Sequence, residues 1–520
     1  MRRQSSAFLV VLCLLFLSSQ DRSETNWSTS IAKIEAVASV IQQRYYESLE
    51  PEKLVYASIR GVLDTLDPHS YFLDPDNFAR MREEYTGKYY GLGIQIQKQE
   101  DRLVVISPIE GGPAYRLGIL PGDVISHING ESTKPLSSFE AMQKLRGPKG
   151  TKVTITIVRE GLDKPFDLTI VREEISLKSV PYAFLLQPGI GYIFIRNFAE
   201  TTVDEFEEKM QTLLGQGMKS LILDLRGNSG GTFFQSVELA DEFLPSGALI
   251  VTIKGRNRRY DREFRARRDG QYEKMPLVIL VNQGSASASE IVAGAVMDHD
   301  RGLILGEDSW GKGLVQTVFP LGPNIAVALT TAKYYTPSGR SIQRDYSHIE
   351  DYILNKEAPE EQREVRYTSK GRRVLGQGGI TPDYKVNSSL SPLTAELLFR
   401  GQIFSYARRF VGRQTELAKK FVFPDERPSS EGEGKMKIEA NFSPPPEIME
   451  ELKQFLRANK VDFKEEAFSQ AEKEIERELR REIFSLLWGM EEGIRVYRQS
   501  DPVVLKAIEV MPEAAKMLEN

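Results

Sequence analysis

The chain has 520 residues, of which 27% are charged and 41% hydrophobic, a composition typical of a soluble protein with about three domains. Its formal net charge is −5 and no domain-sized basic stripe is present, so we expect no nucleic-acid partner. The basic run from Arg256 to Arg268 contains acidic residues and lies between glycines, a pattern typical of a solvated loop.

The N-terminus has the pattern of a secretory signal. Two arginines follow Met1, and Ala7 to Leu17 is an apolar run of eleven residues, shorter than the roughly 20 residues of a spanning helix. We expect residues 1–20 to be a signal peptide and the protein to be exported, to the periplasm or the outer face of the inner membrane. Cys13, the only cysteine, lies in this run, so the processed chain would have no disulfide.

Changes of pattern divide the rest of the chain. Apolar residues at helical spacing predict a helical segment over residues 28–85. Short alternating strands with Gly-rich turns predict a small β-domain over residues 86–173. Apolar strands that alternate with helices predict an α/β core over residues 174–390, and a Glu-, Lys-, Arg- and Leu-rich pattern predicts a helical extension over residues 391–520.

The helical extension can have three roles, because amphipathic helices can self-associate, bind an activating adaptor or cap a core. Of these three roles, self-association is the one that we favour. The expected partners are therefore a second copy of the chain, as in a dimer, and an adaptor or activator protein.

The β-domain carries a peptide-binding pattern. Gly91, Leu92 and Gly93 lead into an alternating strand that begins at Ile94, and such glycines leave backbone N–H groups free to converge on a carboxylate. The strand edge can accept an extended peptide, and a helix over residues 137–145 can form the other wall of the groove. An apolar substrate end is favoured if the groove is lined by Leu92, Ile94, Ile96, Met142 and Leu145. The alternative is a β-domain without a ligand.

Two serine motifs compete for the role of nucleophile. Ser229 lies in a Gly-Asn-Ser-Gly-Gly motif that resembles the nucleophile loop of chymotrypsin-like proteases. That chemistry needs a histidine base before the serine, and only His69 and His127 precede it. His69 comes before the β-domain and His127 is inside it, so neither lies where a protease barrel would place it. The Ser229 loop is better suited to supplying backbone N–H groups.

Ser287 follows the apolar strand 277–281 and precedes a helical segment. At such a turn the helix dipole and free N–H groups favour a developing negative charge. With Glu290 three residues later, the same pattern also fits an ordinary helix cap, so this segment alone does not decide between the two readings.

The position of Lys312 favours the interpretation that Ser287 is a nucleophile. It lies 25 residues after Ser287, between two glycines, and the apolar strand 303–305 can return it to the same sheet edge. Burial lowers the pKa of a lysine, and the neutral amine can then accept a proton. In a strand that starts at Lys312, Gln316 lies on the same face and can hold the amine.

In this order the motifs resemble the C-terminal processing (tail-specific) peptidases, serine proteases with a Ser–Lys pair and an inserted PDZ domain. The resemblance covers roughly residues 30–390 and rests also on the motifs 117–125, 335–340 and 379–383. It implies a multi-domain α/β protein: a crotonase-like α/β protease core, an inserted PDZ β-domain, a helical N-terminal segment and a helical C-terminal extension.

The resemblance also assigns roles to single residues. Ser287 is the nucleophile, Lys312 the general base and Gln316 its orienter. The oxyanion hole consists of the N–H of Ala288 and that of Gly230 or Gly231, and the sequence does not choose between these two glycines.

Further roles concern the PDZ-type module and the core. The binding loop for a peptide C-terminus is Gly91, Leu92, Gly93 and Ile94. Arg146 matches an arginine that links peptide binding to activation in some relatives, and Asp298 matches an acid that we take as structural support.

We therefore expect a serine endopeptidase of the cell envelope that cleaves proteins with apolar C-termini and needs neither a metal nor another cofactor. Its activity should rise with pH as the amine base loses its proton. Two alternatives stay open: a catalytically silent PDZ scaffold on the same fold, and a chymotrypsin-like PDZ protease that uses Ser229.

Overall fold

A computed structural model describes residues 27–99, 101–109, 111–159, 162–354, 359–387, 389–424 and 436–519. The predicted signal peptide lies outside the described residues. The chain divides into two compact units: one contains the residues up to Phe78 and Gln316–Thr330, and the other contains Ala79–Val315 and Thr331 onwards. Within the described ranges, no helix combines the length and apolar character that a membrane crossing demands.

The first unit contains the helices α2 (Trp27–Arg44) and α3 (Pro51–Leu63) and the strand β1 (Tyr71–Leu73). β1 pairs antiparallel with residues 326–328 of β18 (Ile325–Tyr335). The expected helices are confirmed as α2, α3 and α4 (Pro75–Thr86), but the helical prediction missed β1. A strand of three residues is too short for its alternation to show in the sequence.

The second unit contains the predicted β-domain. Its sheet has the order β3-β4-β5-β7-β8, with β6 on β5, and it packs around an apolar cluster that includes Leu103, Ile125 and Ile155. Before and after it, β2 and β9 pair antiparallel, so the chain enters and leaves the domain through one two-stranded ribbon. The elements are β2 (Lys88–Gly91), β3 (Ile94–Gln99), β4 (Arg102–Pro108), α5 (Pro113–Arg116), β5 (Val124–Ile128), β6 (Glu131–Ser132), α6 (Ser138–Leu145), β7 (Lys152–Val158), β8 (Phe166–Val171) and β9 (Glu173–Ser176).

A six-stranded sheet forms the centre of the second unit, in the order β10-β11-β12-β15-β16-β21. All neighbours pair in parallel except β10 and β11. The predicted strands 277–281 and 303–305 are confirmed as β15 and β16. The strands are β10 (Tyr182–Gln187), β11 (Ile190–Phe194), β12 (Ser220–Asp224), β15 (Leu277–Val281), β16 (Leu303–Gly306) and β21 (Tyr384–Lys385).

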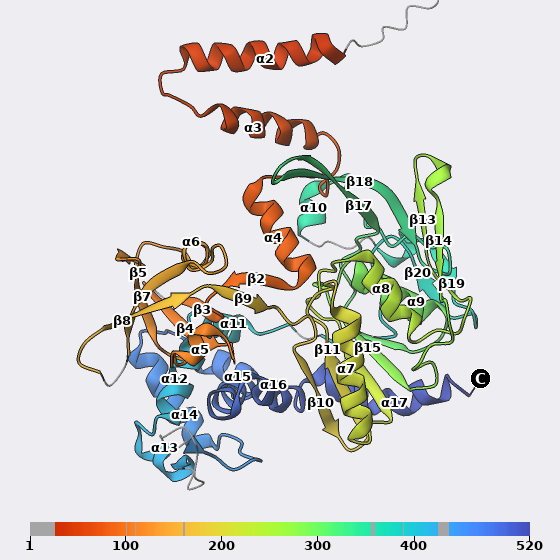
Figure 1. Cartoon of the computed structure of the whole chain (residues 1–520). Helices are drawn as coiled ribbons and strands as arrows, with labels where there is room; N and C mark the ends of the chain where they lie inside the picture. The colour runs from red at the N-terminus through yellow and green to blue at the C-terminus, as the bar shows by residue number, and fades with distance from the viewer. Residues whose placement is uncertain are drawn as a thin grey trace, which may run out of the picture. The chain divides into compact units, whose positions relative to one another are not determined.

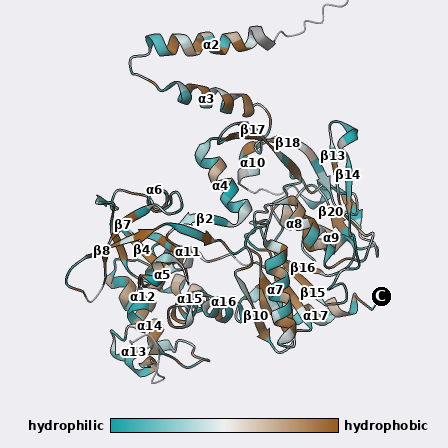
Figure 2. Ribbon diagram, in the orientation of Figure 1, coloured by the Kyte–Doolittle hydropathy of each residue, from teal (hydrophilic) through white to brown (hydrophobic). Residues whose placement is uncertain are grey.

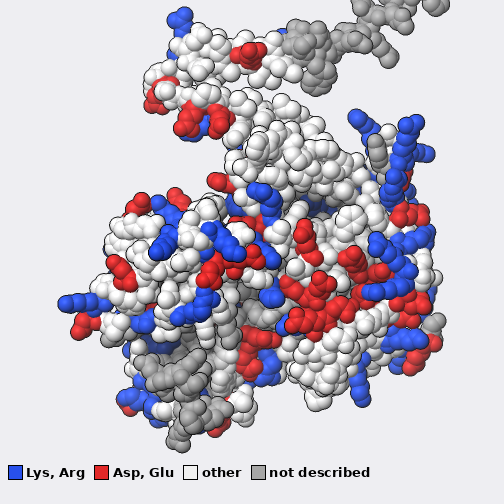
Figure 3. All heavy atoms as spheres, in the orientation of Figure 1, with Lys and Arg blue, Asp and Glu red and all other residues white. Residues whose placement is uncertain are grey.

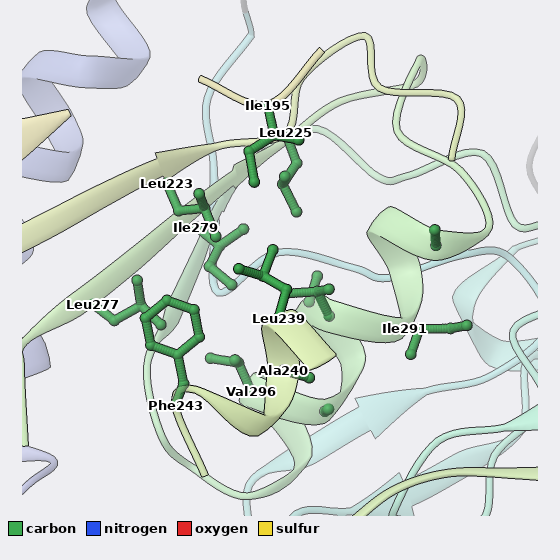
Figure 4. Packing of buried hydrophobic residues seen from close by; sticks show 14 of the residues in the cluster. Ile195, Leu223, Leu225, Leu239, Ala240, Phe243, Leu277, Ile279, Ile291 and Val296 are labelled. Carbon is green, nitrogen blue, oxygen red and sulfur yellow. The ribbon is translucent and has the colours of Figure 1, made fainter. Parts of the chain in front are cut away.

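Alternate residues of these strands face two different layers of helices. Leu223 and Ile279 belong to the cluster formed with α7 (Thr202–Gly215), α8 (Phe233–Asp241) and α9 (Ala288–Asp298). Figure 4 shows Leu223 and Ile279 on the side of Leu239 and Val296, which lie on α8 and α9. Because both faces are covered, the strands are continuously apolar, as Figure 2 shows along the central sheet.

The last helix of the extension, α17 (Pro502–Lys516), covers the opposite face of the sheet. Val503, Val504 and Val510 pack in one cluster with Ile222 and Val278, and Figure 1 shows the helix close to β15. Burial of one such side chain contributes about 1.5–3 kcal/mol. This part of the extension therefore caps the core, which was one of its three expected roles.

The other helices of the extension have a separate apolar core. Leu397, Phe410, Leu452 and Leu479 are buried in it. The elements are α11 (Pro392–Phe399), α12 (Gln402–Val411), α13 (Glu416–Phe421), β22 (Phe423–Pro424), β23 (Met436–Lys437), α14 (Pro446–Ala458), α15 (Glu465–Trp488) and α16 (Met490–Arg498).

A second sheet runs beside helix α9. In it β13 pairs antiparallel with β14 and with residues 332–335 of β18. The described residues after residue 345 include short helices and strands. These further elements are β13 (Leu249–Gly255), η1 (Arg258–Tyr260), β14 (Arg262–Arg265), β17 (Leu314–Gly322), α10 (Ile349–Ile353), η2 (Glu360–Gln362), β19 (Val365–Tyr367) and β20 (Arg373–Leu375).

Buried charges connect α17 to the end of β12. Arg226 donates to both carboxylate oxygens of Asp224 (2.6–3.1 Å) and to Asp501, the N-cap residue of α17 (2.8 and 3.3 Å). Burial opposes the charge on Asp501, but Arg226 and Arg498 outweigh it and lower the pKa of Asp501 to about 2. The cluster joins residues that are 275 positions apart in the chain.

We predict that Asp501→Ala lowers the free energy of unfolding by about 3 kcal/mol, because it removes one partner from a buried pair. The matched control is Glu509→Ala on the same helix, whose exposed pair with Lys506 should contribute less than about 1 kcal/mol. Both can be measured by chemical denaturation. Since the folded-state pKa of Asp501 is depressed, its contribution should be present above pH 4 and disappear as the pH falls towards 2. Equal effects of the two substitutions would contradict the prediction.

Candidate active site

Two loops meet at the carboxyl ends of β12 and β15. In the loop after β15, Asn282 Oδ1 accepts the N–H of Gly227 (2.8 Å). In the loop after β12, the Asn228 carbonyl accepts the N–H of Ala286 (3.0 Å) and the hydroxyl of Ser289 (2.8 Å). The Gly-rich motif around Ser229 and the Ser287 motif, which are nearly 60 residues apart, thus form one packed unit.

Ser287 stands at the N-cap position of α9 with an unusual backbone. Its φ of 55° and ψ of −110° lie outside the extended region of ordinary N-cap residues. Ser137, the N-cap of α6, has φ −68° and ψ 163°, and its hydroxyl accepts the N–H of Glu140. A non-glycine residue in such a strained conformation persists only where its surroundings impose it, and such residues cluster at active sites. The geometry therefore favours the nucleophile reading over the ordinary cap.

The carboxylate of Glu290 imposes this conformation. Glu290 is fully buried and accepts four hydrogen bonds: from the N–H groups of Ser287 (2.8 Å), Gly311 (2.7 Å) and Lys312 (2.9 Å) and from the Ser309 hydroxyl (2.5 Å). Burial raises the pKa of Glu290, and these donors act in the opposite direction. One side chain thus binds the backbone of Ser287 and the backbone of the Lys312 loop.

The hydroxyl of Tyr334 joins the same two segments through their carbonyl groups. It lies 2.6 Å from the Lys312 oxygen and 3.1 Å from the Ser287 oxygen. Burial raises the pKa of Tyr334 well above its ordinary value, so the group remains a neutral donor. Glu290 and Tyr334 together hold Ser287 and Lys312 by N–H groups and carbonyl groups alike.

Lys312 itself is half-buried between two closely packed glycines. Gly311 has φ 86°, and a Cβ on it would lie 2.9 Å from the Gly379 nitrogen. A Cβ on Gly313 would lie 2.9 Å from the Gln343 nitrogen. The glycines therefore allow the loop to pack against its neighbours and bring Lys312 to the Ser287 segment.

The backbone N–H groups beside Ser287 differ in whether they donate a hydrogen bond. The Gly230 N–H donates to Asn228 Oδ1 (2.9 Å). In the part of the chain that the structure describes, the N–H groups of Gly231 and Ala288 donate no hydrogen bond. A Cβ on Gly230 would lie 2.9 Å from Ser287 Cβ, so the glycine pair lies directly against the serine.

The remaining predicted core residues occupy different places. Asp298 is buried and forms an ion pair with Arg340 (2.8 Å), as expected of structural support. Ser229 is exposed on its loop. Gln316 belongs to the first unit, where its amide donates to Thr330 Oγ1 (3.2 Å), so its role toward Lys312 stays a prediction.

The β-domain contains the predicted groove, with a volume of about 210 Å³. Its apolar lining matches the five residues expected from the sequence, and it also includes Tyr89, Gly93, Gln95 and Arg146. At its end, the N–H groups of Leu92 and Gly93 donate no hydrogen bond among the described residues. An apolar slot that ends at two free N–H groups suits a peptide C-terminus.

Arg146 lines this groove and is engaged on two sides. Its guanidinium lies over the Tyr89 ring, 4.3 Å from the centroid, and forms an ion pair with Glu83 of α4. The groove is thereby linked to the helix that precedes the domain.

Sequence reasoning missed the two residues that hold the site together. The local pattern indicates Glu290 only as the acidic member of a helix cap, and no local pattern marks Tyr334. The available signal was a glutamate inside an otherwise apolar helix, because an acidic residue that is fully buried must have several donors.

Three regions of the chain match models of known protein families. The model of peptidase family S41 matches residues 189–352, the PDZ domain model matches residues 91–170, and the model of the activating protease CtpB N-terminal domain matches residues 15–77.

Individual relatives match most of the chain. The carboxy-terminal-processing protease of Bartonella bacilliformis is 38% identical over 416 residues, which are 76% of this chain and 94% of the relative. The carboxy-terminal processing protease CtpA of Bacillus subtilis is 32% identical over 66% of this chain and 76% of its own. Among solved structures, the photosystem II D1 C-terminal processing protease is 29% identical over 68% of this chain and 88% of its own, with a TM-score of 0.37.

We predict that Tyr334→Phe lowers the free energy of unfolding by about 1–2 kcal/mol, because two buried carbonyl groups lose their donor. Tyr335→Phe removes a hydroxyl from the neighbouring, half-buried residue and should change stability by less than about 0.5 kcal/mol. Denaturant titrations of both variants provide the measurement, and an unaffected Tyr334→Phe would refute the bridging role.

Proposed function

Because the chain belongs to the carboxy-terminal-processing proteases of peptidase family S41, we propose that this peptidase is a serine endopeptidase with Ser287 as nucleophile and Lys312 as general base. The observation that carries the proposal is the shared anchoring of Ser287 and the Lys312 loop by Glu290. A helix cap would not need a second segment that carries an amine.

The proposed reaction has two stages. The neutral Lys312 amine takes the proton from Ser287 Oγ as this oxygen bonds to the peptide carbonyl carbon. The tetrahedral intermediate then loses the amine product, which takes the proton back from Lys312, and an acyl-enzyme ester remains. Water gives a proton to the same amine as it attacks the ester. The second tetrahedral intermediate then releases the acid product as Ser287 Oγ takes the proton back from Lys312.

The developing negative charge needs donors beside Ser287. We propose the N–H groups of Ala288 and Gly231 for this role, since Gly230 already donates to Asn228. The N-terminus of α9 supports the same charge through its dipole.

We further propose that the groove binds the C-terminus of protein substrates. The free N–H groups of Leu92 and Gly93 would donate hydrogen bonds to the terminal carboxylate, and the last side chain would pack against the apolar lining. A peptide carboxylate in this groove would compete with Glu83 for the guanidinium of Arg146. We propose that this competition links peptide binding to activation.

Export rests on the sequence of residues 1–20, and we propose the periplasm or the outer face of the inner membrane as the location. We propose that the helices α11–α16 bind a second copy of the chain, which would form a homo-oligomer. An adaptor or activator protein is the other partner that we propose for them.

Ser287→Ala and Lys312→Ala should each lower the cleavage rate of a protein with an apolar C-terminus by at least about a thousandfold. Ser229→Ala should retain most of the activity, because its side chain is exposed and takes no part in the proposed chemistry. Loss of activity only in Ser229→Ala would favour a chymotrypsin-like mechanism. A parent protein that cleaves nothing, even with added partners, would favour the scaffold.

Met142→Lys should raise KM at least about tenfold for substrates with apolar C-termini and leave kcat nearly unchanged, because it puts an unpaired charge into the groove. Gln143→Lys makes a similar change of charge at the neighbouring exposed position of α6 and should leave KM unchanged. Steady-state kinetics on both variants test the proposal, and an equal response of the two would argue against the groove.

A further inference from the structure

The hairpin of β13 and β14 concentrates positive charge on a chain that is otherwise acidic. Residues 254–269 contain eight Lys or Arg and three Asp or Glu, for a net charge of +5 in a chain of −5. Figure 3 shows these cations as a group at the position that β13 and β14 have in Figure 1. All seven arginines of the segment are exposed.

Some of these arginines are neutralised and some are not. Arg265 pairs with Glu263, and Arg268 pairs with Glu242. Arg256, Arg258 and Arg259, which we call the tip arginines, form no salt bridge with any residue that the structure describes. The tip therefore presents three charges without an internal counterion.

Three aromatic rings connect this hairpin to α8, the helix that follows the loop of Gly230 and Gly231. Phe233 and Phe234 begin α8, and their rings lie 4.9 Å and 6.2 Å from the ring of Phe264 on β14. Phe234 is 64% exposed, an unusual position for a large apolar side chain beside two other rings. We call Phe233, Phe234 and Phe264 the aromatic shelf.

The aromatic shelf adjoins the loop that packs against Ser287. Phe234 is three positions after Gly231, a distance of at most about 11 Å even for an extended chain. Phe264 is six residues from Arg258, at most about 20 Å along the hairpin. The site, the shelf and the tip arginines thus follow one another within the span of an extended peptide of about nine residues.

We propose that this surface selects the substrate: polypeptides with an apolar residue within about three positions of the scissile bond and acidic residues within about nine. The inference rests on the proposed function and adds a substrate class to it. The apolar side chain packs on the shelf, and the acidic residues pair with the tip arginines. Charge complementarity favours an acidic segment, and the proximity to the Ser287 loop favours the substrate over another partner.

The test compares two peptides with the same apolar C-terminus and cleavage site. One carries three glutamates four to nine residues from the scissile bond, on either side, and the other carries three glutamines at the same positions. We expect kcat/KM for the glutamate peptide to be about five- to tenfold higher at low salt and the difference to vanish in 0.5 M salt.

The triple variant Arg256→Gln, Arg258→Gln, Arg259→Gln should abolish this preference and leave cleavage of the glutamine peptide unchanged. The matched control Lys178→Gln, Lys219→Gln, Lys274→Gln removes the same number of exposed charges elsewhere and should keep the preference. Phe234→Ser should lower kcat/KM when the residue near the scissile bond is Leu or Phe but not when it is Ser.

Binding of the same peptides to Ser287→Ala, measured by fluorescence anisotropy, separates this inference from the proposed function. A preference in binding without cleavage by the parent would retain the substrate surface and reject the peptidase mechanism. Equal binding of both peptides would overturn the inference, even with full proteolytic activity. Binding of the hairpin to vesicles of anionic lipid, with no peptide preference, would also overturn it.

Discussion

The buried carboxylate of Glu290 accepts hydrogen bonds from the backbone of two segments that the chain presents separately. Burial of this carboxylate is costly and raises its pKa, and the four donors that surround it reduce this cost. Those donors belong to Ser287, Ser309, Gly311 and Lys312, so satisfying one charge also fixes the relative position of the serine and the lysine. The hydrogen bonds that stabilise the buried Glu290 carboxylate are therefore also the ones that position Ser287 and Lys312.

The strained backbone around the site depends on this kind of support. Ser287, Gly230, Gly231 and Gly311 all have positive φ values. A Cβ on Gly231 would lie 2.1 Å from the Phe198 oxygen, so only glycine fits there. The strain persists because Asn228 and Glu290 bind the surrounding N–H groups and leave no relaxed alternative with the same hydrogen bonds.

Sequence patterns predicted most of the fold, because strands buried on both faces are continuous apolar runs, as in Leu277–Val281. They also predicted that the segments of Ser287 and Lys312 lie at the same sheet edge, and Glu290 contacts the backbone of both. They could not assign the partners of Glu290, which lie 21 and 22 residues ahead, because a capping pattern is local. Asp501 likewise has the sequence pattern of a helix cap before Pro502, and nothing local points to Arg226.

The placement of α17 on the central sheet has a consequence for the order of folding. The strands β12, β15 and β16 are complete about 200 residues before α17 is synthesised. During that interval the face formed by Ile222, Val278 and Leu280 has no cover, and Arg226 lacks Asp501. This face of the sheet can therefore be covered only after α17 has been made. A peptidase built in this way gains this cover, and the buried pair of Arg226 with Asp501, only after the loops that carry Ser287 and Lys312 have left the ribosome.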